Sequence, residues 1–305
     1  MIGTYIKLAR VKQWAKGAFV LIGPLYGGAY TTREDILAIV GAFFAFDFAS
    51  SACYIENDLR DREQDKAHPR KKHRPIASGK VSVKTAYTLA ALFALAAAGC
   101  VMLVGVGGEH HWRRELLGAC VLLYIFNVLA YSAFLKHKMI ADVISLSLGF
   151  VLRVLGGCAA VAVIPSPWLL NVTFFLSMFL AFGKRLGERK SMGESAAAAR
   201  VIQSRYTDDL LRMLVVATGV ASLLIYAVYV QDQHEKYTLG FNLLWLTMLP
   251  ATYGLFRAMV KVEKGEYDDP TEMATKDWPF QLAAAVFGIL TIALIAWVRM
   301  RSPPP

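Results

Sequence analysis

Residues 54–65 read Tyr-Ile-Glu-Asn-Asp-Leu-Arg-Asp-Arg-Glu-Gln-Asp, and a basic stretch, Lys66-Ala-His-Pro-Arg-Lys-Lys-His-Arg-Pro75, follows directly. On an α-helix, with about 100° between successive residues, Asn57, Asp58, Asp61 and Asp65 share one arc of about 100°. Acids gathered on one face repel one another unless a cation lies between them. Mg²⁺ prefers such oxygen ligands, and it usually leaves other coordination positions to water or substrate phosphates. We therefore interpret Asp58, Asp61 and Asp65 as ligands of a Mg²⁺-diphosphate site.

The alternative is a solvated helix end whose acids are neutralised by Arg60, Arg62 and Lys66. However, Glu56 and Glu63 point to the opposite side of the predicted helix. The acids thus segregate by face instead of alternating with the bases, which favours the metal site.

Apolar runs long enough to cross a bilayer recur along the whole chain. The chain has 305 residues, is 56% hydrophobic and has a mean hydropathy of +0.43. This composition predicts an all-α polytopic membrane protein that forms a single transmembrane domain over residues 1–305. We expect nine transmembrane helices, at about residues 17–31, 35–56, 83–106, 115–135, 140–163, 166–186, 210–231, 239–260 and 278–299.

Lysine and arginine residues predict the orientation in the membrane. Of the 33, 26 fall on the side of the N-terminus, six on the other side and one within a span. By the positive-inside rule, we expect a protein of the inner (plasma) membrane with its N-terminus and acidic stretch in the cytoplasm and its C-terminus outside. Arg10 and Lys16 either orient the first span or bind phosphate. The net charge of +10 reflects this topology and attraction for anions, and no nucleic-acid-binding module is present.

Two charged residues, Asp47 and Arg153, fall inside predicted spans, where an isolated charge is costly. Asp47 shares a helical face with Ser51 and with the acids of the motif, so a polar stripe descends into the membrane. Arg153 shares a stripe with Asp142 and small residues, which indicates close packing or a lined cavity. Because Asp142 lies too far along the same helix, we expect Arg153 to pair with Asp47 or with a substrate anion.

Basic residues follow the acidic stretch and also end the sixth predicted span. Lys71 and Arg74 are candidates to neutralise phosphate oxygens. Lys184 and Glu188 form an i,i+4 pair, which by itself is ordinary support for a helix end. Lys184 and Arg185 are nevertheless expected at the same membrane depth as the acids, where a diphosphate needs charged hydrogen-bond donors.

The pattern Asn57-Asp58-x-x-Asp61-x-x-x-Asp65 resembles the first aspartate motif of the UbiA-type intramembrane prenyltransferase superfamily. Within that superfamily, the chain most resembles the decaprenyl-phosphate phosphoribosyltransferases, also called decaprenylphosphoryl-5-phosphoribose synthases. The matching segments extend over almost the whole chain: Gln13-Trp14-x-Lys16, Tyr54 with Asn57-Asp58-x-Arg60-Asp61, His68-Pro69-x-Lys71-x-x-Arg74-Pro75-Ile76-Ala77, Leu135-Lys136-His137, Asp142, Gly149-Phe150, Arg153 and Gly183-Lys184-Arg185. The resemblance implies a helical bundle around a central cavity, which opens to lipid and is capped by cytoplasmic loops 57–82 and 187–209.

The resemblance also implies a reaction, the Mg²⁺-dependent transfer of 5-phosphoribose from phosphoribosyl diphosphate to decaprenyl or another polyprenyl phosphate. The product would serve arabinosyl-donor and cell-wall polysaccharide synthesis. Catalytic roles are implied for Asp58, Asp61, Lys184 and Arg185. We expect substrate contacts from Lys16, Asn57, Lys71, Arg74, Tyr131, Lys136, Asp142, Arg153 and Glu188.

One departure from the prenyl-diphosphate branch of the superfamily is informative. Those enzymes carry a second acidic motif after the sixth span, where this chain reads Lys184-Arg185-Leu-Gly-Glu188. One acidic motif together with one basic motif suits a single diphosphate donor and a second substrate that carries phosphate. The length of the lipid, the oligomeric state and the role of Asp47 stay open.

Two other functional classes compete with this interpretation. One is an aromatic prenyltransferase of the same fold, which transfers a prenyl group to a quinone or haem precursor. The other is a transporter, because Asp47 and Arg153 are candidates for an ion path. Transport is disfavoured, because the sequence shows no internal repeat and no pair of Gly/Pro-broken spans at matching positions.

Overall fold

The structure is a computed structural model of the chain, and it describes residues 2–67, 71–105, 111–192, 206–266 and 270–301. These residues are almost all helical, and eight of their helices are long and apolar enough to span a membrane. The chain is therefore an all-α multi-pass membrane protein, as its composition predicts. His68 and Pro69, and the greater part of the predicted loop 187–209, lie outside the described residues.

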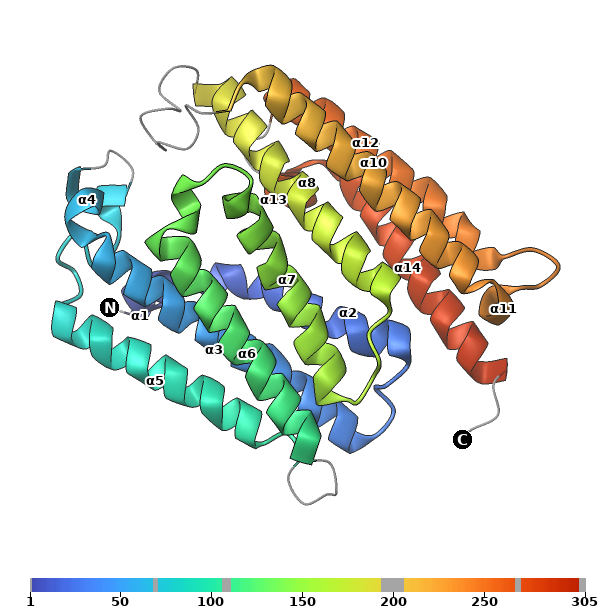
Figure 1. Ribbon diagram of the computed structural model, residues 1–305, viewed down its shortest axis with the longest axis horizontal. Coiled ribbons are helices and arrows are strands. Elements are labelled where there is room, and N and C mark those ends of the chain that lie inside the picture. Colours follow the sequence, from blue (N-terminus) through green and yellow to red (C-terminus); the bar gives the residue numbers. More distant parts are fainter. Residues whose placement is uncertain (1, 68–70, 106–110, 193–205, 267–269, 302–305) are drawn as a thin grey trace. The chain divides into compact units, whose positions relative to one another are not determined.

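The first of two compact units comprises residues 1–135 and 148–165. Within it, α5 runs alongside α3 (Figure 1). Its elements are α1 (Ile2–Leu8), η1 (Val11–Gly17), α2 (Ala18–Gly27), α3 (Arg33–Arg60), α4 (Arg62–Ala67), η2 (Lys71–His73), α5 (Val83–Met102) and α6 (His111–Ala133), together with the later part of α7 (Ala141–Ala160).

Helix α3 is the longest element of this unit, and local sequence explains where it starts and how it packs. The side chain of Thr32 accepts a hydrogen bond of 3.0 Å from the backbone N–H of Asp35, which caps the first turn. Small residues then recur every three or four positions along the buried face, which lets neighbouring helices approach closely. These are Ala38, Ala42, Ala45 and Ala49.

The packing of α2 against α7 depends on one glycine. A Cβ atom at Gly157 would lie 1.9 Å from the carbonyl oxygen of Val20. No side chain fits at that distance, so only glycine allows the two backbones to meet there.

The second compact unit comprises residues 136–147 and 166–305. Within it, α10 lies along α8, and α12 packs against α14 (Figure 1). Its core includes Phe179, Phe182, Leu211 and Val215. Its elements are η3 (Leu135–His137, of which Leu135 is in the first unit), the start of α7, α8 (Pro167–Met192), α10 (Asp208–Asp232), α11 (His234–Tyr237), η5 (Leu243–Thr247), α12 (Met248–Glu263), α13 (Pro270–Lys276) and α14 (Trp278–Arg301).

Of the nine predicted spans, 17–31 is the one to which no helix long enough to span a membrane corresponds among the described residues. Helix α2 covers only ten residues, about 15 Å at 1.5 Å per residue, but η1 leads directly into it. Because Arg10 contacts Asp58 near the end of α3, the chain from Arg10 to the start of α3 at Arg33 still runs the length of that helix. Helix α2 contains Pro24, and Gly28 stops it in a left-handed conformation with φ of 70°. The apolar composition of this segment therefore predicted a longer helix than its Pro and Gly residues permit.

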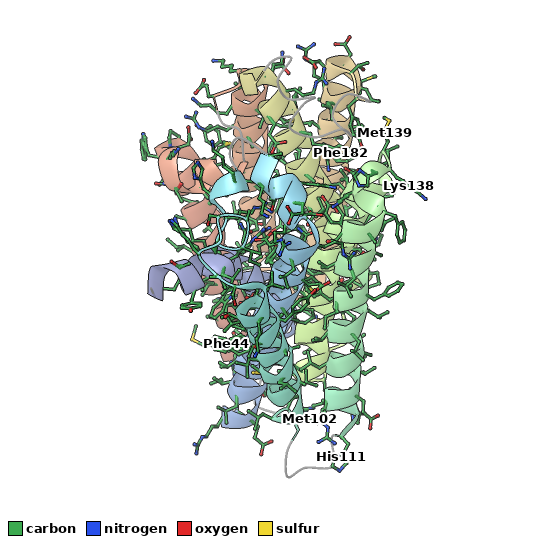
Figure 2. The ribbon with its side chains drawn as sticks, turned by 90° about the vertical axis from the view of Figure 1, so that its left-hand side faces the viewer. Phe44, Met102, His111, Lys138, Met139 and Phe182 are labelled. Carbon is green, nitrogen blue, oxygen red and sulfur yellow. The ribbon has the colours of Figure 1, made fainter. Side chains whose placement is uncertain are left out.

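Long apolar side chains cover the outward faces of the spanning helices. Leu95, Leu122 and Phe126 are 69%, 68% and 70% exposed, which is typical of contact with lipid tails. In Figure 2, Met102 and His111 mark the end of the first unit at which α5 stops and α6 begins.

Candidate active site

The aspartate motif spans the junction between α3 and α4. Helix α3 ends at Arg60, and Asp61 occupies the C-cap with φ −85° and ψ 4°. The N–H of Asp61 still donates to the carbonyl of Asn57, and that of Asp65 donates to the carbonyl of Asp61, each at 2.9 Å. Because these bonds continue the helical register across the break, Asp58 and Asp65 face the same side.

Two arginines neutralise this buried pair of acids. The side chains of Asp58 and Asp65 are each only 3% exposed. Arg74 Nη1 donates to Asp58 Oδ1 at 2.9 Å and to Asp65 Oδ2 at 2.8 Å, so one nitrogen joins both carboxylates. Arg10 Nη2 donates to Asp58 Oδ1 at 2.5 Å, and its guanidinium lies 4.5 Å from the ring centre of Tyr54. We call Arg10, Asp58, Asp65 and Arg74 the acidic cluster.

The glutamates of the same stretch lie apart from this cluster. Glu63 is exposed, and it accepts hydrogen bonds of 2.8 Å from Arg62 and 3.0 Å from Lys66. These bonds lower the pKa of Glu63, as in an ordinary solvated ion pair. Glu56 pairs with Arg60 at 3.7 Å. The acids are therefore divided between a buried face and a solvated one.

The acids of the motif can be compared with the ligands that Mg²⁺ requires. Within the residues that the structure describes, no three acids, histidines or cysteines are close enough together to hold a metal ion. In the structure, Arg74 lies between Asp58 and Asp65 as their cation, and metal binding by Asp58, Asp61 and Asp65 together stays a prediction. Mg²⁺ usually takes one or two protein carboxylates and completes its shell with water and phosphate. Asp58 and Asp65 both bond to Nη1 of Arg74, so their carboxylates lie close enough together to suit the one or two protein ligands of such an ion.

Other residues predicted to contact substrate in the first unit flank this cluster or lie deeper along the helices. Asn57, Asp61 and Lys71 are half-buried next to it in the chain, and Tyr131 is half-buried on α6. The ammonium of Lys16 lies 6.0 Å from the ring centre of Phe150. Their roles toward a substrate remain predictions.

Arg153 has a protein partner that the sequence did not indicate. Its Nη2 donates to the hydroxyl of Tyr124 at 2.9 Å and its Nη1 to the carbonyl of Gly149 at 3.1 Å, and its guanidinium lies 4.4 Å from the Tyr124 ring centre. The expected ion pair with Asp47 is absent from the described residues. Both carboxylate oxygens of Asp47 are buried there without a hydrogen-bond partner.

In the second unit, Asp142 at the start of α7 forms an ion pair with Arg185 of α8. Both side chains are almost fully buried, at 1% and 2% exposure. Two atoms of Arg185, Nε and Nη1, are buried without a hydrogen-bond partner among the described residues. Such donors suit an incoming anion, because a buried guanidinium without acceptors is costly.

Tyr206, just before α10, completes this arrangement. Its hydroxyl accepts a hydrogen bond of 2.8 Å from the backbone N–H of Ile140, which has a φ of 65°, and lies 3.4 Å from Asp142 Oδ1. Burial raises the pKa of Tyr206, so its hydroxyl stays protonated and donates a hydrogen bond to Asp142. We call Asp142, Arg185 and Tyr206 the buried triad.

The remaining basic-loop residues are half-buried. Lys184 and Glu188 lie one turn apart on α8, and Lys136 belongs to η3.

Further along the chain, Arg257 donates to Asp277 at 2.5 Å, and Asp277 also accepts from the N–H of Phe280 at 2.9 Å, at the start of α14. Asp277 therefore links α12 to the start of α14.

We expect Tyr206→Phe to lower kcat/KM by about three- to tenfold, because one buried hydrogen bond contributes about 0.5–1.5 kcal/mol. The substitution leaves the N–H of Ile140 without its acceptor and removes the donor to Asp142. The measurement is kcat and KM for each phosphate substrate, alongside the thermal unfolding midpoint. If activity fell only in proportion to the folded fraction, Tyr206 would not position Asp142 for the reaction.

Comparison with known proteins finds a family match, relatives of similar sequence and solved structures of similar fold. Residues 17–274 match the UbiA prenyltransferase family. A decaprenyl-phosphate phosphoribosyltransferase of Mycolicibacterium smegmatis is 32% identical over 98% of this chain and 91% of its own. The enzyme of that name from Corynebacterium glutamicum is 32% identical over 96% of this chain and 84% of its own. A solved UbiA homologue from Archaeoglobus fulgidus, bound to GPP and Mg²⁺, superposes with a TM-score of 0.68 at 17% identity and covers 96% of this chain and 99% of its own.

Proposed function

Because this chain belongs to the UbiA prenyltransferase family, we propose that it transfers 5-phosphoribose from phosphoribosyl diphosphate to a polyprenyl phosphate and releases diphosphate. Relatives named decaprenyl-phosphate phosphoribosyltransferase match it over nearly its full length, which supports this choice within the family. The observation that carries the proposal is that basic residues follow the apolar part of α8 within the same helix. Arg185 there is buried with two unsatisfied donors, which suits a phosphate-bearing substrate.

The acidic cluster is the proposed site of the diphosphate leaving group. Asp58 and Asp65, with Asp61 at the helix break, would hold Mg²⁺, which supplies Lewis-acid neutralisation of the charge that develops on diphosphate. Arg74 and Arg10 would then bind the diphosphate in addition to neutralising the acids. Their guanidiniums, which donate to Asp58 and Asp65 in the structure, would also donate to phosphate oxygens of the bound diphosphate, with Lys71 beside them in the chain.

The acceptor needs no general base in this mechanism. A phosphate monoester has a second pKa of about 6, so a polyprenyl phosphate is largely ionised at neutral pH and is already a nucleophile. Its oxygen forms the new bond to the anomeric carbon as the bond to diphosphate breaks, through an oxocarbenium-like state. Arg185 and Lys184 would hold a substrate phosphate in place, so that catalysis rests on positioning and electrostatics.

The proposed site faces the cytoplasm of a plasma-membrane protein whose C-terminus lies outside. The support is the distribution of lysine and arginine, of which 26 of 33 fall on the side of the acidic cluster. Phosphoribosyl diphosphate is water-soluble and would enter from that side. The polyprenyl tail would lie among the apolar side chains of the spans.

A substrate matrix tests the proposal. Purified protein in detergent receives either labelled phosphoribosyl diphosphate with polyprenyl phosphate or a labelled prenyl diphosphate with 4-hydroxybenzoate, each with Mg²⁺ and with EDTA. We expect label in the lipid fraction only from the first pair and only with Mg²⁺. Prenylation of 4-hydroxybenzoate instead would favour an aromatic prenyltransferase.

A further inference from the structure

A pocket of about 220 Å³ lies in the first unit, and none of the residues that line it belongs to the acidic cluster. Helix α1 forms one wall, and the end of η2 together with the segment that leads to α5 forms the other. The six lining residues are Gly3, Thr4, Lys7, His73, Pro75 and Lys80. Three of them are basic and none is acidic, so we call this site the basic pocket.

Among the residues that the structure describes, the three bases of the pocket have no counter-charge. Among the described residues, no ion pair or hydrogen bond engages the side chain of Lys7, His73 or Lys80. Like charges that converge on one pocket repel one another, and an anion between them relieves that repulsion. With Thr4 the pocket also offers a hydroxyl donor, so its chemistry suits a phosphate group.

Packing beneath the pocket holds its two walls together. Leu8, the neighbour of Lys7, is 1% exposed and packs with Ile55, Ile76 and Val81. Gly79 has a φ of 74°, and this left-handed turn sets the direction of the chain at Lys80. The bases are therefore carried on fixed backbone instead of on a free tail.

The basic pocket is separate from the acidic cluster, although the two share a segment of chain. Arg74 lies between His73 and Pro75, but its guanidinium is bound to Asp58 and Asp65. Its two neighbours in sequence line the pocket instead. One short segment thus presents one face to the acids and another to the pocket.

Helix α1 also carries apolar side chains that are partly exposed. Tyr5 and Ile6 are 43% and 49% exposed, beside Lys7. Aromatic and aliphatic side chains next to lysine are typical of segments at a membrane surface, where anionic headgroups attract cations. From these observations, we propose that the basic pocket binds the phosphate of an anionic lipid headgroup, independently of the substrates of the proposed reaction.

The test compares two double variants of the full-length protein that lose the same charge. Lys7→Gln/Lys80→Gln removes two bases of the pocket. Lys72→Gln/Lys84→Gln removes two exposed lysines of the neighbouring segment that do not line it. In detergent, the thermal midpoint is titrated with phosphatidylglycerol, with phosphatidylcholine as the neutral lipid and with glycerol 3-phosphate as the soluble phosphate.

We expect phosphatidylglycerol to stabilise the wild type, with an apparent Kd about tenfold higher for Lys7→Gln/Lys80→Gln and about unchanged for Lys72→Gln/Lys84→Gln. His73→Gln should weaken binding in the same direction. Glycerol 3-phosphate could stabilise the wild type as strongly as phosphatidylglycerol does and lose this effect in Lys7→Gln/Lys80→Gln. The pocket would then bind phosphate, but the proposal that the phosphate belongs to a lipid would be overturned. If both double variants responded alike, binding would follow net charge only and the basic pocket would not be a site.

Discussion

Asp58→Ala is expected to lower kcat/KM about a thousandfold, which corresponds to about 4 kcal/mol of transition-state stabilisation. The reason is that Asp58 alone contacts both Arg10 and Arg74 in the acidic cluster. Its loss removes a proposed metal ligand and leaves both guanidiniums without that carboxylate. Label transfer from phosphoribosyl diphosphate at saturating Mg²⁺ measures the effect.

Glu63→Ala is the matched control for Asp58→Ala. Glu63 lies five residues further along the same stretch, but it is exposed, and within the described part of the chain it bonds only to Arg62 and Lys66. We expect activity within about twofold of the wild type, since exposed ion pairs contribute at most about 1 kcal/mol. Equal damage from both substitutions would mean that the division of the acids by face has no functional meaning.

Arg185→Ala is expected to lower kcat/KM at least about tenfold, because a lost donor to a charged oxygen costs about 1.5–3 kcal/mol. It should also reduce stability, since Asp142 would stay buried without its partner. Titrating each substrate separately shows where the residue acts. A higher KM for phosphoribosyl diphosphate places Arg185 on the donor, and a higher KM for the lipid phosphate places it on the acceptor.

A double variant separates these two effects of Arg185. Asp142→Leu/Arg185→Met replaces the buried ion pair with apolar side chains of similar size, a change that is often neutral for folding. We expect the thermal midpoint to recover toward that of the wild type while activity stays low. Recovery of activity together with stability would make the buried triad a structural element only.

Features set by local sequence were predictable. The helical spacing of Asp58 and Asp65 placed them on one face, and the bonds from Asp61 to Asn57 and from Asp65 to Asp61 preserve that face across the break. The main helices followed from runs of apolar residues. The first span was overestimated, because hydropathy does not register that Pro24 and Gly28 limit α2.

Features that depend on distant residues were not predictable. Arg10 and Asp58 are 48 positions apart, and Tyr206 and Asp142 are 64 apart, so no periodicity relates them. Arg185 and Asp142 were each expected at a substrate, but nothing in the sequence indicated that they pair with each other. Tyr124 resembled any other aromatic residue of an apolar span until its hydroxyl was found to accept from Arg153.

The most direct measurement of the proposed reaction compares phosphoribosyl diphosphate labelled at two different positions. Phosphoribosyl diphosphate is labelled with ³²P either on the 5-phosphate or on the terminal phosphate of the diphosphate, and each form is incubated with the protein, Mg²⁺ and polyprenyl phosphate. The account predicts that the 5-phosphate label enters the lipid fraction while the diphosphate label stays in water as free diphosphate, in equal amounts. Terminal label in the lipid, or lipid product without released diphosphate, would contradict phosphoribosyl transfer.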